Sequence, residues 1–280
     1  MPYIMQTVIL LYRAWQSLSA TPPVVDTQSR IMLFSHYHTP FHRLSHSRCH
    51  SMSFVPSFFE FLITHLQQEE RRRMLASMAV TTAPELWLSL EAAALLDIHR
   101  DRFDLGEPLS ERHNVPRWLV AAERKKVDIW VEDQLAEQPP HALEFKVVHN
   151  NKNAYQKIYE IRYDLEKFIP NTQWNEQANR WGIVLLVFHN FYDDQSGGYV
   201  RHKDFDNCQR MLEAFKHGLQ DDNEWYATAP KLELVAEPTL LFDMNSANYI
   251  DATKGESALY MALVRKKLDP DVADNEHRRV

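Results

Sequence analysis

The stretch that most restricts the fold is RWGIVLLVFHNF, residues 180–191, which is apolar almost without interruption. A strand with one face in water alternates apolar and polar residues, whereas a strand buried on both faces is apolar throughout. We therefore predict a central strand covered by helices on both sides. With 280 residues, 45% of them hydrophobic, the chain has enough apolar material for one large core of this kind.

The flanking sequence predicts the elements around that strand. Helical spacing of apolar residues indicates five helices, over residues 54–80, 81–99, 150–169, 205–219 and 256–268. Strand patterns cover residues 123–133, 141–148 and 231–244, and residues 102–118 are rich in turn formers, with room for one short strand. Two strands, a helix and a further strand in this order predict an α/β domain around a mixed sheet, with an antiparallel pair followed by a crossover.

The helix predicted over residues 81–99 has a polar residue, Thr82, in position to cap its first turn. Its core-facing side is expected to consist of Leu86, Leu90, Ala93 and Ala94.

The first 53 residues differ in composition from the rest of the chain. Four Arg and one Asp give them a net charge of +3, which leaves −10 for residues 54–280 out of a total of −7. Their five His match no closed zinc-binding pattern. We expect residues 1–53 to be a disordered extension or a product of a misplaced start, residues 54–268 to form the folded domain, and residues 269–280 to form a polar tail.

Charge and cysteine content restrict the setting. Two Cys cannot form a disulfide framework, which favours a reducing cytoplasm, and no apolar run approaches the roughly 20 residues that span a bilayer, so no membrane role is expected. The acidic balance argues against a protein that coats nucleic acid, so any DNA contact needs a local basic groove or consists of weak binding helped by metal ions. The phosphate loop GxxxxGK[ST] is absent from the sequence.

Three charged residues interrupt two neighbouring strands. In HALEFKVV, Glu144 and Lys146 are two positions apart and therefore lie on one face of their strand. In KKVDIWV, Asp128 stands between Val127 and Ile129, where an unpaired carboxylate would be costly. If the strands pair, Asp128 and Glu144 converge, and two carboxylates are what a hard cation such as Mg²⁺ prefers.

This pattern resembles that of the PD-(D/E)XK nuclease superfamily, in which an aspartate on one strand precedes Glu/Asp-X-Lys on the next. Here Asp128 is followed, after fifteen residues, by Glu144-Phe145-Lys146. The likeness covers roughly residues 84–190, including a Glu-bearing helix before the strands and a helix after them. It implies a restriction-endonuclease-like core, a central mixed sheet flanked by helices. The proline of the family motif is replaced by Val127.

The resemblance also implies roles for individual residues. Asp128, Glu144 and the Phe145 carbonyl would bind Mg²⁺ or Mn²⁺, and Lys146 would position the attacking water. An acid of the preceding helix would support the site. Glu85 and Glu91 are both candidates, and we choose Glu91 because it lies nearer the middle of that helix. On the following helix, Gln156 with Tyr159 loosely resembles the Gln-and-Tyr pair of the RecB-like branch, although the spacing is three instead of four.

The expected activity is therefore Mg²⁺-dependent hydrolysis of DNA phosphodiester bonds. DNA is the expected partner, while the pattern does not separate DNA from RNA and leaves a homodimer open. One alternative is a non-catalytic binding or assembly module of the same fold, which the acidic balance of residues 54–280 suits better. Another is a surface ion pair between Glu144 and Lys146, worth roughly 0–1 kcal/mol, although it leaves Asp128 unexplained.

Overall fold

The structure is a computed structural model that describes residues 53–110, 113–170, 172, 174, 177–191, 201–220, 232–245 and 247–266. The chain divides into two units, Met1–His50 and Ser51–Val280, and the description concerns the second. Apart from Ser53, the extension expected over residues 1–53 lies outside the described residues, as does the tail expected over 269–280.

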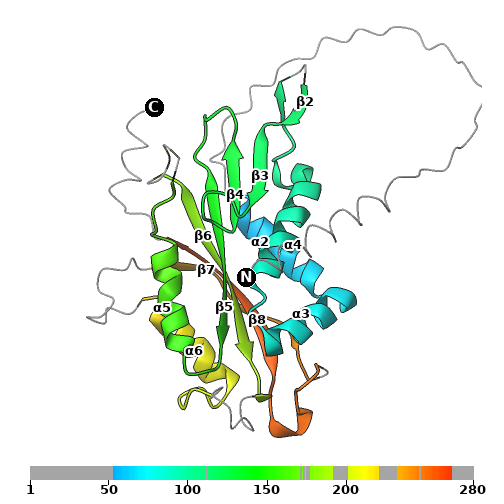
Figure 1. The fold of residues 1–280 in the computed structure, drawn as a ribbon, viewed down its shortest axis with the longest axis vertical. Helices are drawn as coiled ribbons and strands as arrows, with labels where there is room; N and C mark the ends of the chain where they lie inside the picture. The colour runs from blue at the N-terminus through cyan, green and yellow to red at the C-terminus, as the bar shows by residue number, and fades with distance from the viewer. Residues whose placement is uncertain are drawn as a thin grey trace, which may run out of the picture. The chain divides into compact units, whose positions relative to one another are not determined.

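The described residues form an α/β fold with a mixed sheet and helices on both faces (Figure 1). The helices are α2 (Val55–Leu66), α3 (Glu69–Thr81), α4 (Glu85–Ile98), α5 (Ala154–Asp164) and α6 (Cys208–Gly218), with 3₁₀ turns η1 (Arg100–Phe103) and η4 (Ala252–Lys254). The strands are β1 (Pro108–Ser110), β2 (His113–Pro116), β3 (Trp118–Ala122), β4 (Ile129–Asp133), β5 (His141–His149), β6 (Asn179–Phe188), β7 (Leu232–Asp243) and β8 (Ala258–Lys266).

Six strands form the main sheet in the order β3-β4-β5-β6-β8-β7, and β1 and β2 form a separate pair. Among these six strands β5 and β6 run parallel, joined through α5, and the other neighbours are antiparallel. The predicted antiparallel pair followed by a crossover is therefore present as β4, β5, α5 and β6. The predicted central strand is β6, which is buried along nearly its whole length.

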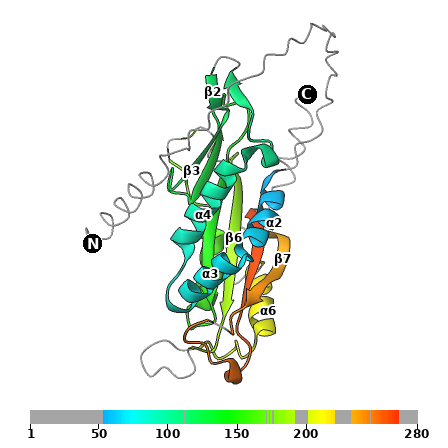
Figure 2. The same cartoon turned by 90° about the vertical axis from the view of Figure 1, so that its right-hand side faces the viewer.

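Helices cover the two faces of this sheet in separate groups. Residues 143, 145 and 147 of β5 pack with α2, α3 and α4 in the larger core cluster. Val148 of the same strand packs with α5 and α6 in a second cluster on the opposite face. Figure 2 shows α2, α3 and α4 in front of the sheet. The alternation of β5 side chains thus sends Leu143, Phe145 and Val147 toward one layer of helices, and Glu144 and Lys146 toward the other.

The last predicted helix, over residues 256–268, is wrong. The segment Ala258–Lys266 is strand β8, inserted between β6 and β7. Its Ala, Leu and Met residues are good helix formers, but pairing with two strands and burial between two helical layers override that preference.

Two expectations about the first helices also need correction. Residues 54–80 form two helices, α2 and α3, which break at Gln67 and Gln68. Arg71, Arg72 and Arg73 lie in the first half of α3, after Glu69 and Glu70 in its first turn. Thr82 does not cap α4, because its hydroxyl donates to the Met78 carbonyl at the end of α3.

The expected buried face of α4 is also wrong. Leu86 and Leu90 are 60% and 45% exposed, and Ala94 is exposed as well, although Ala93 is buried. The side that faces the core carries Leu88, Ser89, Ala92, Ala93, Leu95 and Leu96. Because α4 is apolar nearly all the way round, its periodicity does not define a face. The face that meets the sheet is marked instead by Glu85, whose contact with β5 is described below.

Candidate functional site

Strand β4 is shorter than β5, so part of the β5 edge has no strand beside it. The β4–β5 ladder ends at Ile129 opposite Leu143, and extending this register by one residue places Asp128 opposite Glu144. Asp128 lies just before β4, not inside it as expected. It turns its side chain to the edge of β5, where Oδ2 accepts a hydrogen bond of 2.6 Å from the Phe145 N–H.

A second carboxylate serves the same edge two residues further along β5. Oε1 of Glu85, in the first turn of α4, accepts a hydrogen bond of 2.9 Å from the Val147 N–H. Two carboxylates thus replace the acceptors that a longer β4 would have supplied. Because N–H and C=O of one strand residue point to the same edge, the Phe145 carbonyl faces this side as well.

Glu144 and Lys146 point to the other face of the sheet, toward the end of α5. Glu144, which is 4% exposed, pairs with Lys167 through an Nζ–Oε1 distance of 2.7 Å. Lys146 pairs with Asp164 at 2.7 Å, and Lys167 lies 3.9 Å from the same Asp164 carboxylate. Acids and amines therefore alternate where α5 passes over β5.

Burial and repulsion between neighbouring carboxylates raise the pKa values of three acids at this site. Burial, with the neighbouring Asp128 and Asp164, raises the pKa of Glu144 from 4.5 to about 7 even though Lys167 opposes the rise. Burial also raises the pKa of Asp128, with Glu85 adding to it, although the Phe145 N–H, Lys146 and Lys167 pull it down. The exposed Glu123 has a raised pKa through desolvation and the charge of Asp128. A cation bound near these carboxylates would favour their ionised form and lower their pKa values.

The same acids raise the pKa of Lys146. Burial by itself would lower the pKa of Lys146, but the hydrogen bond and charge of Asp164, with Glu85 and Glu144, raise it above its usual range. Lys146 therefore stays an ammonium ion at neutral pH, suited to donating hydrogen bonds and stabilising negative charge.

Two residues expected in the site lie elsewhere. Glu91 accepts from His65 at 2.8 Å and from Arg71 at 2.7 Å, which ties α4 to α2 and α3. Gln156 is exposed and donates to Glu160 at 2.9 Å, two turns before Asp164 on α5. The choice of Glu91 over Glu85 is therefore corrected: an acid at the start of α4 reaches the strand edge, because the helix begins beside β5.

Small and buried residues hold α5 close to the sheet. Gly182 of β6 pairs with Glu144, and a Cβ at that position would lie 2.8 Å from Val264 and 3.4 Å from Leu165 after α5. The buried Arg180 donates to the Lys167 carbonyl, and the Lys167 N–H donates to Tyr163 at 2.9 Å. These contacts fix the backbone that carries Asp164 and Lys167 beside Glu144.

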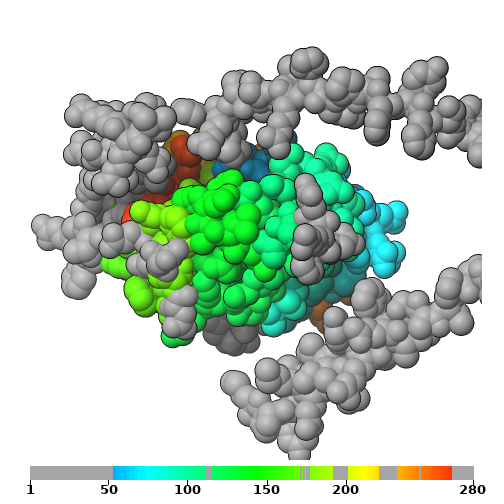
Figure 3. All heavy atoms as spheres, turned by 90° about the horizontal axis from the view of Figure 1, so that it is seen from above, coloured from blue at the N-terminus to red at the C-terminus, as the bar shows by residue number. Residues whose placement is uncertain are grey.

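A basic turn adjoins the acidic edge. The β3–β4 hairpin closes through the Glu123 N–H on the Asp128 carbonyl, and its turn carries Arg124, Lys125 and Lys126. Lys125 bonds to Glu132 at 3.1 Å and lies over the Trp130 ring, whereas Lys126 is exposed. Figure 3 shows the green part of the chain, which includes β3, β4 and β5, on the face seen from above.

The donor set fits a hard divalent cation in type. Asp128, Glu85 and Glu144, with the Phe145 carbonyl, supply oxygen ligands around one stretch of β5. No three His, Cys, Asp or Glu side chains among the described residues converge as a ready metal site. Each of these carboxylates is instead held by a backbone N–H or by a lysine.

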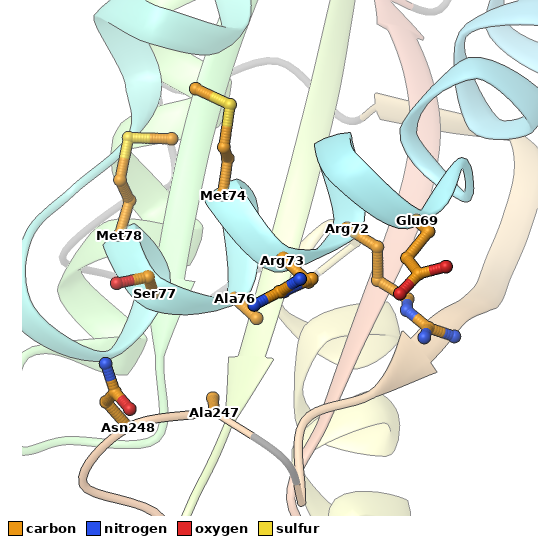
Figure 4. Close-up of a pocket in the computed structure, with 9 residues that line it drawn as sticks. All are labelled: Glu69, Arg72, Arg73, Met74, Ala76, Ser77, Met78, Ala247 and Asn248. Carbon is orange, nitrogen blue, oxygen red and sulfur yellow. The ribbon is translucent and has the colours of Figure 1, made fainter.

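A second charged cluster surrounds Arg117, which pairs with Glu107 at 3.2 Å, Asp133 at 2.8 Å and Glu137 at 2.7 Å. A shallow pocket beside α3, shown in Figure 4, contains none of the residues of the β5 edge. Its lining is Glu69, Arg72, Arg73, Met74, Ala76, Ser77, Met78, Ala247 and Asn248. No described helix combines the length and the apolar character that crossing a membrane requires.

Comparisons with known proteins add no assignment. The chain matches no protein-family model, no curated protein and no solved structure.

Sequence reasoning missed Asp164 and Lys167. The two are one helical turn apart and follow a strand that carries Glu-X-Lys, but this spacing is common on helix surfaces. The spacing alone does not reveal that this turn lies beside Glu144, because that depends on where the β5–α5 connection places the helix. The signal that could have selected Glu85 was its place in the first turn after Pro84, at the end of the helix nearest the strands.

Proposed function

We propose that this chain is a metal-dependent nuclease of the PD-(D/E)XK type, with a restriction-endonuclease-like core, that hydrolyses DNA phosphodiester bonds. One observation carries the proposal: Asp128 and Glu85 flank the open edge of the strand that carries Glu144-Phe145-Lys146. The order α4, β3, β4, β5, α5, β6 supports it, because it supplies the Glu-bearing helix, the strand pair and the following helix of that pattern.

In this proposal the acidic residues bind the metal ion and the basic residue donates hydrogen bonds. Asp128, Glu144 and the Phe145 carbonyl would hold Mg²⁺ or Mn²⁺, with Glu85 beside them. A divalent cation so bound acidifies its water and offsets charge on a phosphate. Lys146, kept protonated by its acidic neighbours, would donate to the attacking water or to a phosphate oxygen.

The charge distribution allows this substrate despite the acidic total. Lys126 is exposed on the turn that leads into Asp128, so a phosphate backbone could meet a cation on its way to the acids. Because residues 54–280 carry a net charge of −10, DNA affinity is expected to be low and to depend on metal ions.

Plasmid nicking by the purified protein with Mg²⁺ or Mn²⁺ tests the proposal. We expect Lys146→Ala to lower the nicking rate by about 100-fold or more, the size seen when a charge-stabilising group is removed. Lys266→Ala is the matched control, since Lys266 pairs with Glu166 on the surface. Equal nicking by wild type and Lys146→Ala would trace the activity to a contaminant and defeat the proposal.

The two helix acids give a second comparison. Glu85→Gln should reduce nicking, whereas Glu91→Gln should leave the rate near that of wild type, because Glu91 contacts His65 and Arg71 instead of the strand edge.

The alternative is a non-catalytic binding module of the same architecture. It is favoured by one feature, the neutralisation of Glu144 by Lys167 within the chain. Absence of cleavage on single-stranded DNA, double-stranded DNA and RNA, with either metal, would support this alternative.

A further inference from the structure

Lys167 is the amine that pairs with Glu144. Its Nζ lies 2.7 Å from Glu144 and 3.9 Å from Asp164, and its charge also acts on Asp128 and Glu123. Lys146, by contrast, makes its ion pair with Asp164. Both ammonium groups therefore act on several carboxylates, but the one paired with Glu144 belongs to Lys167.

Lys167 is anchored by its backbone, and its side chain is partly exposed. Its N–H bonds to Tyr163 and its carbonyl accepts from Arg180, so the backbone is held independently of the side chain. The side chain is 35% exposed, whereas that of its partner Glu144 is 6% exposed. The ammonium can therefore exchange a carboxylate for water, while Glu144 stays in place.

From this arrangement we propose that Lys167 is a tethered cation that holds the place of the divalent ion, and that metal binding expels it from Glu144. This inference rests on the proposed metal site but does not require nuclease activity. It explains why the described acids do not form a ready metal site: Glu144 is already occupied by the chain's own cation.

Competition of this kind predicts an unusual effect of removing a lysine. Lys167→Gln takes away the competing charge and keeps the backbone contacts, so Mn²⁺ should bind at least tenfold more tightly than to wild type. Lys167→Arg keeps the charge and should bind Mn²⁺ no better than wild type. Lys266→Gln, which removes a surface Lys–Glu pair near the same segment, should leave affinity unchanged.

The measurement is titration of Mn²⁺ alone into the purified full chain, followed by calorimetry or by electron paramagnetic resonance. Equal or weaker Mn²⁺ binding by Lys167→Gln would overturn the inference, and so would absence of binding by both proteins up to millimolar Mn²⁺. Because no nucleic acid is present, the outcome is separate from nicking. Tighter binding without cleavage would retain this inference and defeat the nuclease proposal, whereas cleavage without tighter binding would do the reverse.

Discussion

The raised pKa of Glu144 leads to a quantitative expectation for Glu144→Gln. A carboxyl whose pKa rises from 4.5 to about 7 on folding opposes folding when it is ionised. The stability linked to its protonated form is complete below pH 4.5 and is lost as the pH rises through 7. At pH 8 this loss is on the order of 3 kcal/mol.

Glutamine removes the charge and retains a carbonyl oxygen that Lys167 can donate to. The pKa of about 7 already includes the opposing effect of Lys167, so the full linkage value is an upper bound on the gain. We expect Glu144→Gln to stabilise the metal-free protein by about 1–3 kcal/mol at pH 8, or roughly 2–10 °C in melting temperature. The gain should nearly disappear near pH 4.5, where Glu144 is protonated in the folded state and about half protonated in the unfolded state.

Thermal unfolding in EDTA at pH 8 and pH 4.5, with urea titration as a second measure, checks this expectation. Glu91→Gln is the control, because it also replaces a partly buried glutamate with ion-pair partners and should lose stability slightly or not at all. A melting temperature for Glu144→Gln at or below that of wild type at pH 8 would show that the Lys167 pair outweighs burial, and would refute the reasoning.

Two further predictions concern the frame of the site. Asp128→Ala should destabilise by about 1–3 kcal/mol more than Asp128→Asn, because alanine leaves the Phe145 N–H without its acceptor, and urea unfolding of the two variants measures the difference. Gly182→Ala should cost about 1–3 kcal/mol in the same assay, since its Cβ would lie 2.8 Å from Val264 and 3.4 Å from Leu165; an unchanged midpoint would show that the sheet and α5 yield freely.

The parts of the fold that sequence reasoning predicted are those in which local pattern and tertiary environment agree. β6 was recognisable because a strand buried on both faces is apolar throughout. The hairpin-length linker between β4 and β5 predicted their antiparallel pairing, and this pairing brings Asp128 opposite Glu144.

The failures have a common physical origin, which is that environment overrode local pattern. β8 has helix-forming residues but lies between two strands. Glu85 accepts a hydrogen bond from Val147 of β5. The side of α4 that carries Glu85, Ser89 and Ala92 therefore lies against the sheet. Both the buried face and the site acid were therefore misassigned for one reason, the unseen contact between the start of α4 and β5.

The early end of β4 has a consequence for the choice of substitutions at Asp128 and Glu85. Asp128 and Glu85 accept hydrogen bonds from the Phe145 and Val147 N–H groups, so truncating either side chain leaves a backbone donor at the β5 edge without its acceptor. Asp128→Asn and Glu85→Gln keep an acceptor for these N–H groups and therefore disturb the sheet less. Two residues added to β4 would instead pair their main chain with this edge of β5. The sheet would stay intact, with no room for the two carboxylates.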